Sequence, residues 1–169
     1  MSRSKRRTTL WITTAAVAVV AAVGLYLFQP WKLFTTDRVD EAPPAAAGPQ
    51  AGAVKPVVNG AFVSHEHDTS GLAEIQRLAD GKANLRLTNL RTSDGPAVHV
   101  WLSDQPVTAG DGGNLDDGKH IDLGSLKGNE GNQNYAIPAG TDLKQFSTVT
   151  IWCERFSVSF GAAELKQRA

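Results

Sequence analysis

The sequence predicts an all-β fold, an antiparallel β-sandwich of about eight short strands, preceded by one N-terminal transmembrane helix and a disordered linker. Three observations predict this arrangement. An uncharged apolar run follows a basic N-terminus, and an Ala/Pro/Gly-rich segment follows that run. The remainder consists of short β-type runs separated by clusters of Gly, Pro, Asn and Asp, without a helical period of comparable strength.

The apolar run at residues 10–28 is about 19 residues long and nearly matches a hydrocarbon core roughly 30 Å thick. Four basic residues stand before it: Arg3, Lys5, Arg6 and Arg7. Positive flanks stay in the cytoplasm, so we expect residues 1–9 inside, a signal-anchor helix at 10–31 and the rest outside. The chain is then a single-pass cell-membrane protein that contacts the lipid bilayer through one helix.

A cleaved signal peptide is the alternative, because it shares the basic start and the apolar run. Signal peptides usually have a shorter apolar core and end in a small-x-small cleavage site. This run ends in four bulky residues: Leu25, Tyr26, Leu27 and Phe28. That ending favours a retained helix.

Residues 32–56 are expected to form a linker. From Thr35 to Pro56 the chain is rich in Ala, Pro and Gly and has few bulky side chains to bury, so we expect disorder or partial polyproline structure. A flexible chain of about 22 residues spans on the order of 25 Å. The folded domain is then expected at residues 57–169.

The charge distribution argues against a nucleic-acid partner. The chain has 17 basic and 17 acidic residues; five of the basic ones precede Leu33 and all the acidic ones follow it, which leaves the remainder at −5. A mildly acidic body without a basic patch is poorly suited to bind a phosphate backbone.

Cys153 is the only cysteine. It therefore has no partner for an intramolecular disulfide, and a multi-cysteine zinc site and CxxCH haem attachment are excluded. The sequence also lacks a nucleophile elbow, a Walker loop and a recognisable metal-ligand motif. We therefore assign no metal site and expect a protein that is not an enzyme in its own right.

The eight candidate strands are residues 57–64, 73–78, 83–90, 98–103, 120–123, 134–137, 149–153 and 156–160. The clearest alternation is at 98–103, where Val98, Val100 and Leu102 face one way. The last two runs differ in phase, which requires a bulge or tight bend near Glu154 and Arg155, beside Cys153.

The domain contains four notable segments: GAFVSHEHDTSGLAEI at 60–75, GPAVHVWLS at 95–103, IDLGSLKGNEGNQNYAIP at 121–138 and TVTIWCERFSVSFGAAEL at 148–165. In this order they resemble the DM-thirteen domain family, a proposed electron-transfer domain that accompanies DOMON domains in some extracellular proteins. The resemblance implies a β-sandwich with one family-defining cysteine, proposed to act as a bare redox thiol or as a ligand to a group such as haem. In this chain that residue is Cys153.

The resemblance also makes His67 a candidate second haem ligand or a group that lowers the pKa of the thiol. Family members commonly read GPD before the central strand, whereas this chain has Ala97 after Gly95 and Pro96. Plainer interpretations stay open: Cys153 as a small buried hydrophobe, and His67 as a turn residue that caps local backbone. His65 and His99 are more typical of surface positions.

Two predicted loops are candidates for ligand binding. Residues 127–135 (KGNEGNQNY) predict a structured loop, for which a plain turn is favoured over a ligand site. Residues 111–118 (DGGNLDDG) have the composition of a calcium loop, but they lack its alternating oxygens and closing Glu. A solvated acidic loop is the favoured interpretation.

These observations predict a membrane-tethered extracytoplasmic domain that acts in redox or electron transfer through Cys153, with an envelope or redox partner that the sequence does not identify. The alternative is a non-catalytic binding module that presents loops, such as residues 129–134, to an envelope protein or polysaccharide.

The expected topology can be tested with protease added to intact cells. Cleavage between Thr35 and Pro56 should release nearly the whole domain and leave a short membrane-bound stub, because the linker is expected to be exposed. If the domain were protected from protease until the cells were lysed, the expected orientation would be wrong. A domain found free in the medium without protease would support the signal-peptide alternative.

Overall fold

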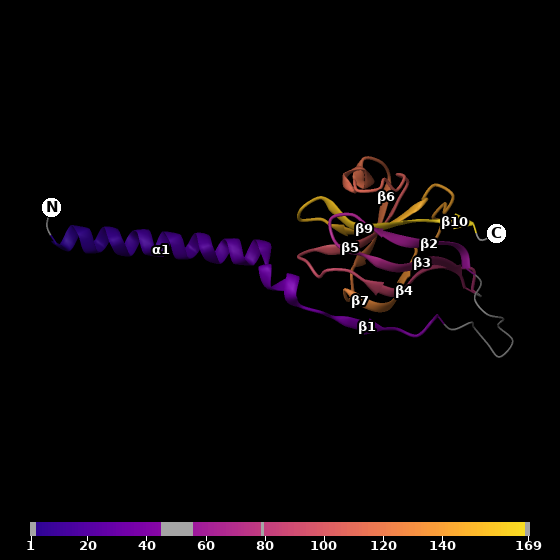
Figure 1. Cartoon of the computed structure of the whole chain (residues 1–169), viewed down its shortest axis with the longest axis horizontal. Helices are drawn as coiled ribbons and strands as arrows, with labels where there is room; N and C mark the ends of the chain where they lie inside the picture. Colours follow the sequence, from indigo (N-terminus) through magenta and orange to yellow (C-terminus); the bar gives the residue numbers. More distant parts are fainter. Residues whose placement is uncertain (1–2, 45–55, 79, 168–169) are drawn as a thin grey trace.

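The computed structural model describes residues 3–44, 56–78 and 80–167. Within them lie helix α1 (Arg3–Phe28), the 3-10 turns η1 (Pro30–Phe34) and η2 (Gly113–Asp116), and ten strands (Figure 1). The strands are β1 (Arg38–Asp40), β2 (Pro56–Ser64), β3 (Ser70–Arg77), β4 (Ala83–Arg91), β5 (Val98–Ser103), β6 (His120–Ser125), β7 (Glu130–Ala136), β8 (Thr148–Cys153), β9 (Val158–Glu164) and β10 (Lys166–Gln167).

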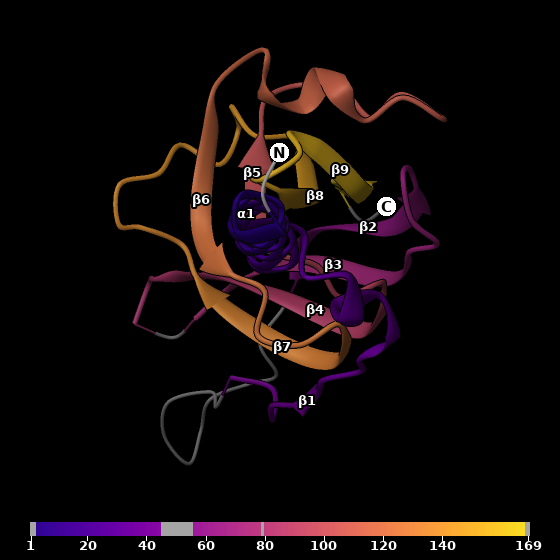
Figure 2. The ribbon, with the colours of Figure 1, turned by 90° about the vertical axis from the view of Figure 1, so that its left-hand side faces the viewer.

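The strands form one continuous curled sheet in the order β1-β7-β4-β3-β2-β9-β8-β5-β6, and β10 pairs with β2. Strand β2 belongs to both halves of the sheet, because it pairs with β3 up to Ala61 and with β9 from Phe62 onward. Figure 2 shows the result: the sheet curls until β6 and β7 lie side by side. The prediction of an all-β domain is confirmed, and one addition, the parallel pairing of β1 with β7, makes the sheet mixed.

The core lies inside the curl and contains the alternating residues of β5 as predicted, since Val98, Val100 and Leu102 are all buried there. A smaller apolar cluster lies on the outer face of β5 and β8. There the Trp101 ring stacks on Trp152 at a centroid distance of 4.9 Å, and Leu115 of η2 is fully buried beside them. The acidic loop therefore also has a packing role.

Helix α1 is the one helix among the described residues that is long and apolar enough to cross a membrane, and its residues 7–28 are not buried. It ends at Phe28, three residues before the predicted boundary. Gln29 adopts a left-handed conformation, and Pro30 begins η1 because a proline cannot donate the next helical hydrogen bond. The Phe28 ring then stacks on Phe156 of the domain at 5.9 Å.

Strand β1 lies in the segment that was expected to be disordered. Arg38–Asp40 pair in register with residues 130–132 of β7, and the Glu41 N–H donates to the Asn132 carbonyl at 2.9 Å. The prediction of disorder is therefore wrong for residues 38–41, because partners some ninety residues away satisfy their backbone groups. Residues 45–55 of the expected linker lie outside the described residues.

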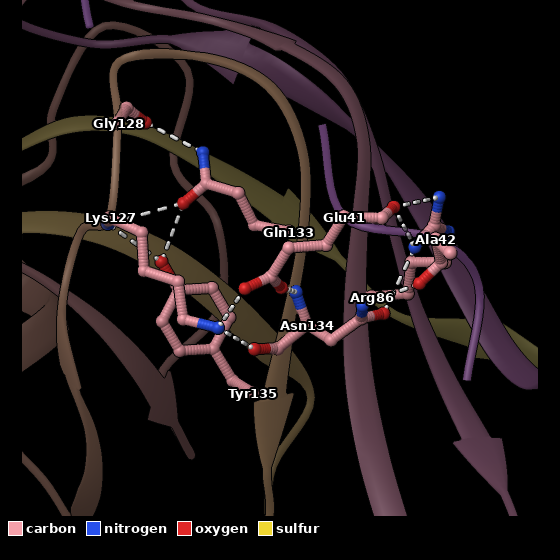
Figure 3. A network of polar contacts seen from close by, with 8 residues as sticks. All are labelled: Glu41, Ala42, Arg86, Lys127, Gly128, Gln133, Asn134 and Tyr135. Atoms are coloured by element: carbon pink, nitrogen blue, oxygen red, sulfur yellow. Dashed lines mark hydrogen bonds and ion pairs between the residues drawn. The ribbon is translucent and has the colours of Figure 1, made fainter. Parts of the chain in front are cut away.

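Polar side chains hold β1 against the sheet (Figure 3). The Glu41 carboxylate accepts hydrogen bonds from Lys127 Nζ at 2.7 Å and from the Asn134 N–H at 2.6 Å. The Lys127 ammonium is the main reason that the pKa of Glu41 is lowered. Arg86 of β4 adds bonds to the Glu41 carbonyl and to Asn134 Oδ1.

The same network continues into the interior at β7. Tyr135 donates its hydroxyl to Gln133 Oε1 at 2.7 Å, and Gln133 Nε2 donates to the Gly128 carbonyl at 2.6 Å. Burial raises the pKa of Tyr135 to about 12. Residues 130–133, which the sequence predicted as loop ahead of the predicted strand at 134–137, are thus strand residues of β7. The side-chain amides of residues 132–134 are satisfied within the domain.

Gly131 allows β1 to dock, and this can be tested by substitution. Its φ is +108°, and a Cβ there would collide with the Val39 carbonyl oxygen. Gly131→Ala should release β1, so that the amides of residues 38–41 exchange with deuterium much faster, as measured by mass spectrometry. Gly140→Ala is the matched control, since Gly140 also has a positive φ (+82°) but nothing within 4 Å of an added Cβ. Equal exchange in the two variants would contradict this role.

Candidate functional site

Cys153 is the last residue of β8, and its side chain faces the core with 0% exposure. Val98 pairs with it on one side and Val158 on the other. Its Sγ donates a hydrogen bond to the Pro96 carbonyl at 3.3 Å. The thiol is therefore enclosed by β5, β9 and the loop that precedes β5.

The tight bend expected beside Cys153 is present as the turn at residues 154–157, in which Ser157 has a positive φ. A β-bulge also occurs, but it lies between Ile151 and Trp152 in the pairing of β8 with β9. Burial raises the pKa of the Cys153 thiol, while the backbone N–H groups of Phe156 and Arg155 oppose that shift. The folded protein thus holds Cys153 as a neutral thiol near neutral pH.

The loop before β5 is locked onto this turn. Ala97 has a φ of +55°, and its carbonyl accepts the Glu154 N–H at 3.0 Å. A left-handed conformation costs a residue with a Cβ roughly 1–2 kcal/mol, and Asp or Asn tolerates it better than Ala. Ala97 therefore holds a strained backbone conformation. The strained loop presents the Pro96 carbonyl to Cys153.

A cavity of about 400 Å³ lies between the end of α1 and the domain. Its lining, mostly apolar, comes from Phe28, Gln29, Pro30, Lys32 and Leu33 on the anchor side and from Glu66, His67, Asp94, Gly95, Pro96, Phe156, Val158 and Phe160 on the domain side. The Asp94 carboxylate fixes this junction, because it accepts hydrogen bonds from Lys32 Nζ at 3.0 Å and from Thr35 Oγ1 at 2.8 Å.

The two residues that the sequence singled out lie on either side of the cavity wall. His67 lines the cavity, and its ring packs on Phe160 at a centroid distance of 4.0 Å. Cys153 does not line the cavity. The wall between the cavity and Cys153 contains Pro96, whose carbonyl accepts the Sγ hydrogen bond, and Val158, which pairs with Cys153. The apolar lining could hold a flat apolar group, and the His67 imidazole is the lining side chain that could ligate a metal centre in it. The enclosed sulfur does not fit the role of a second axial ligand.

Two other sequence candidates have local structural roles. His65 is half-buried, not a surface residue as expected, and its Nδ1 lies 2.9 Å from Ser159 Oγ; burial lowers its pKa. Residues 129–134, proposed to present a binding surface, extend into β7 and pair with β1 and β4. Residues 130–134 are therefore strand residues rather than a free loop. The contribution of η1 to the cavity had no signal in the sequence.

The curled sheet, the enclosed thiol and the apolar junction define a small β-domain that follows a helix long and apolar enough to cross a membrane. Residues 61–165 match the family described as electron transfer DM13, and this match covers more than half of the chain. The chain therefore belongs to the DM13 family. No curated protein and no solved structure matches it at a significant level.

Alkylation tests the state of Cys153, and the single cysteine makes the readout unambiguous. In the full-length chain, iodoacetamide should react much more slowly than with the same chain unfolded in denaturant, because the thiol is enclosed and its pKa is raised. The rate should still be rising above pH 9, where a free cysteine with a pKa of about 8.5 is already mostly thiolate. A rate that levels off below pH 8 would show a thiolate instead.

Proposed function

We propose that the chain is a membrane-tethered electron-transfer domain, held outside the cytoplasm, that exchanges electrons with a redox group seated in the junction cavity. The family match supports a redox-related role. The observation that carries the proposal is the composition of the cavity wall, which joins the end of the anchor helix to the loops that enclose Cys153.

The chemistry of the lining favours a flat apolar group. Pro96, Phe156 and Val158 offer apolar surface, and His67 offers a nitrogen that can ligate a metal centre or accept a hydrogen bond. Haem bound there would supply a one-electron iron couple. The residues of this chain would then hold it through His67 and exclude water with Phe28 and Phe160.

Cys153 is proposed to act without contacting the bound group, because residues of the cavity wall lie between them. A buried neutral thiol is poorly suited to nucleophilic attack, but electron transfer does not require contact between the reacting groups. The Sγ hydrogen bond to the Pro96 carbonyl connects the thiol to a residue that lines the cavity. A change at Cys153 should therefore alter the potential of the bound group more than its affinity.

Reconstitution with haem separates these roles. The full-length chain in lipid nanodiscs should develop a Soret band on titration with haem, and His67→Ala should weaken binding by at least tenfold. His120→Ala is the matched control, because this exposed histidine stacks on Trp101 away from the cavity lining. Cys153→Ser should keep the band and shift its midpoint potential.

Two outcomes would contradict the proposal. A band lost in Cys153→Ser and kept in His67→Ala would place the sulfur, not the imidazole, at the group. If the chain showed neither a Soret band nor any redox couple by protein-film voltammetry, the electron-transfer role itself would be refuted for this cavity.

A further inference from the structure

Three side chains converge on the outer surface, away from the core-facing Cys153. His99 comes from β5, Asp122 from β6 and Glu154 from the turn after β8. One ligand atom from each lies within 4.8 Å of the others. They are far apart in the sequence, and they meet because β5 pairs with both β6 and β8.

The hydrogen bonds of His99 define its free lone pair. His99 Nδ1 lies 2.9 Å from Asp122 Oδ2. An ionised carboxylate can only accept, so Nδ1 carries the proton of that bond. In the neutral imidazole this leaves the lone pair on Nε2. Nε2 faces the Glu154 carboxylate, with Oε2 at 3.7 Å, and the Ser125 hydroxyl lies 3.5 Å away at the limit of a hydrogen bond.

Nε2 and Oε2 are both acceptors, and a cation between them would satisfy both lone pairs, whereas the Ser125 hydroxyl can donate to only one of them. A proton shared by Nε2 and Oε2 would draw the two atoms to about 2.7–3.2 Å. The observed 3.7 Å is longer. Two bonds of about 2.0–2.2 Å to one metal ion hold their donor atoms roughly 3–4 Å apart, depending on the angle between them. The spacing thus matches a bridging metal ion better than a bridging proton.

We propose that His99 Nε2 and the Glu154 carboxylate bind a divalent transition-metal ion, with water completing its coordination. Asp122 is a positioning residue, because a carboxylate on the other ring nitrogen fixes the tautomer and orientation of a metal-binding imidazole. A mixed nitrogen and oxygen donor set favours Cu²⁺ over Zn²⁺ in affinity. The site is accessible, since the side chains of Asp122 and Glu154 are 40% and 44% exposed.

Metal titration of the full-length chain in nanodiscs, prepared without a polyhistidine tag, tests the site. Zn²⁺ should bind with one-to-one stoichiometry by calorimetry, and Cu²⁺ should give an electron paramagnetic resonance spectrum with coupling to one imidazole nitrogen. His99→Gln and Glu154→Gln should each abolish this binding. His120→Gln is the matched control and should bind as the wild type does.

Asp122→Asn distinguishes positioning from direct ligation. It should weaken binding by about 10- to 100-fold and leave the imidazole coupling intact at saturation. Thermal unfolding of each variant, measured without metal, checks that the domain still folds. The proposal would be overturned if His99→Gln bound Zn²⁺ as tightly as the wild type. It would also be overturned if His99 showed two ring N–H signals by ¹⁵N NMR with no change on adding Zn²⁺, because the cation at Nε2 would then be a proton.

Discussion

The change of partner along β2, from β3 to β9, is the constraint on which the rest of the structure depends. The first part of β2 pairs with β3 and its last three residues with β9, so one strand carries the sheet around the core. Gly60 stands just before this change, and a Cβ there would collide with the Glu164 carbonyl of β9. Because β9 then pairs with β8, the path of β2 also decides where Cys153 and its turn meet the loop before β5.

The sequence predicts those parts of the fold whose signal is local. The alternation in β5 identifies its buried face, and turn residues separate β2 to β6, β8 and β9 well enough to predict a strand at each. The signal is misleading in β7, where Gly131 and its asparagine neighbours are typical of turns but serve close packing against β1. Strand β1 itself is three residues long and has no local signal, because its stability comes from the distant Asn132 and Lys127.

The candidate sites, too, are predictable from the sequence only where their signal is local. Cys153 is identifiable as the only cysteine and from the family resemblance, but its enclosure by Pro96 depends on a contact across 57 positions. The cavity is formed by η1 together with loops of the domain, which no periodic pattern connects. His99, Asp122 and Glu154 belong to no motif, since only the pairing of β5 with its two neighbours brings them together. Convergence of this kind is a property of topology.

The attachment of the anchor has a consequence for how the domain meets other molecules. Lys32 and Thr35 are bound to Asp94, and β1 is fixed to β7, so the chain is joined to the domain within a dozen residues of the helix end. If α1 crosses a bilayer, the domain would then lie close to the lipid surface. Molecules in the same bilayer would then reach it by lateral diffusion in two dimensions.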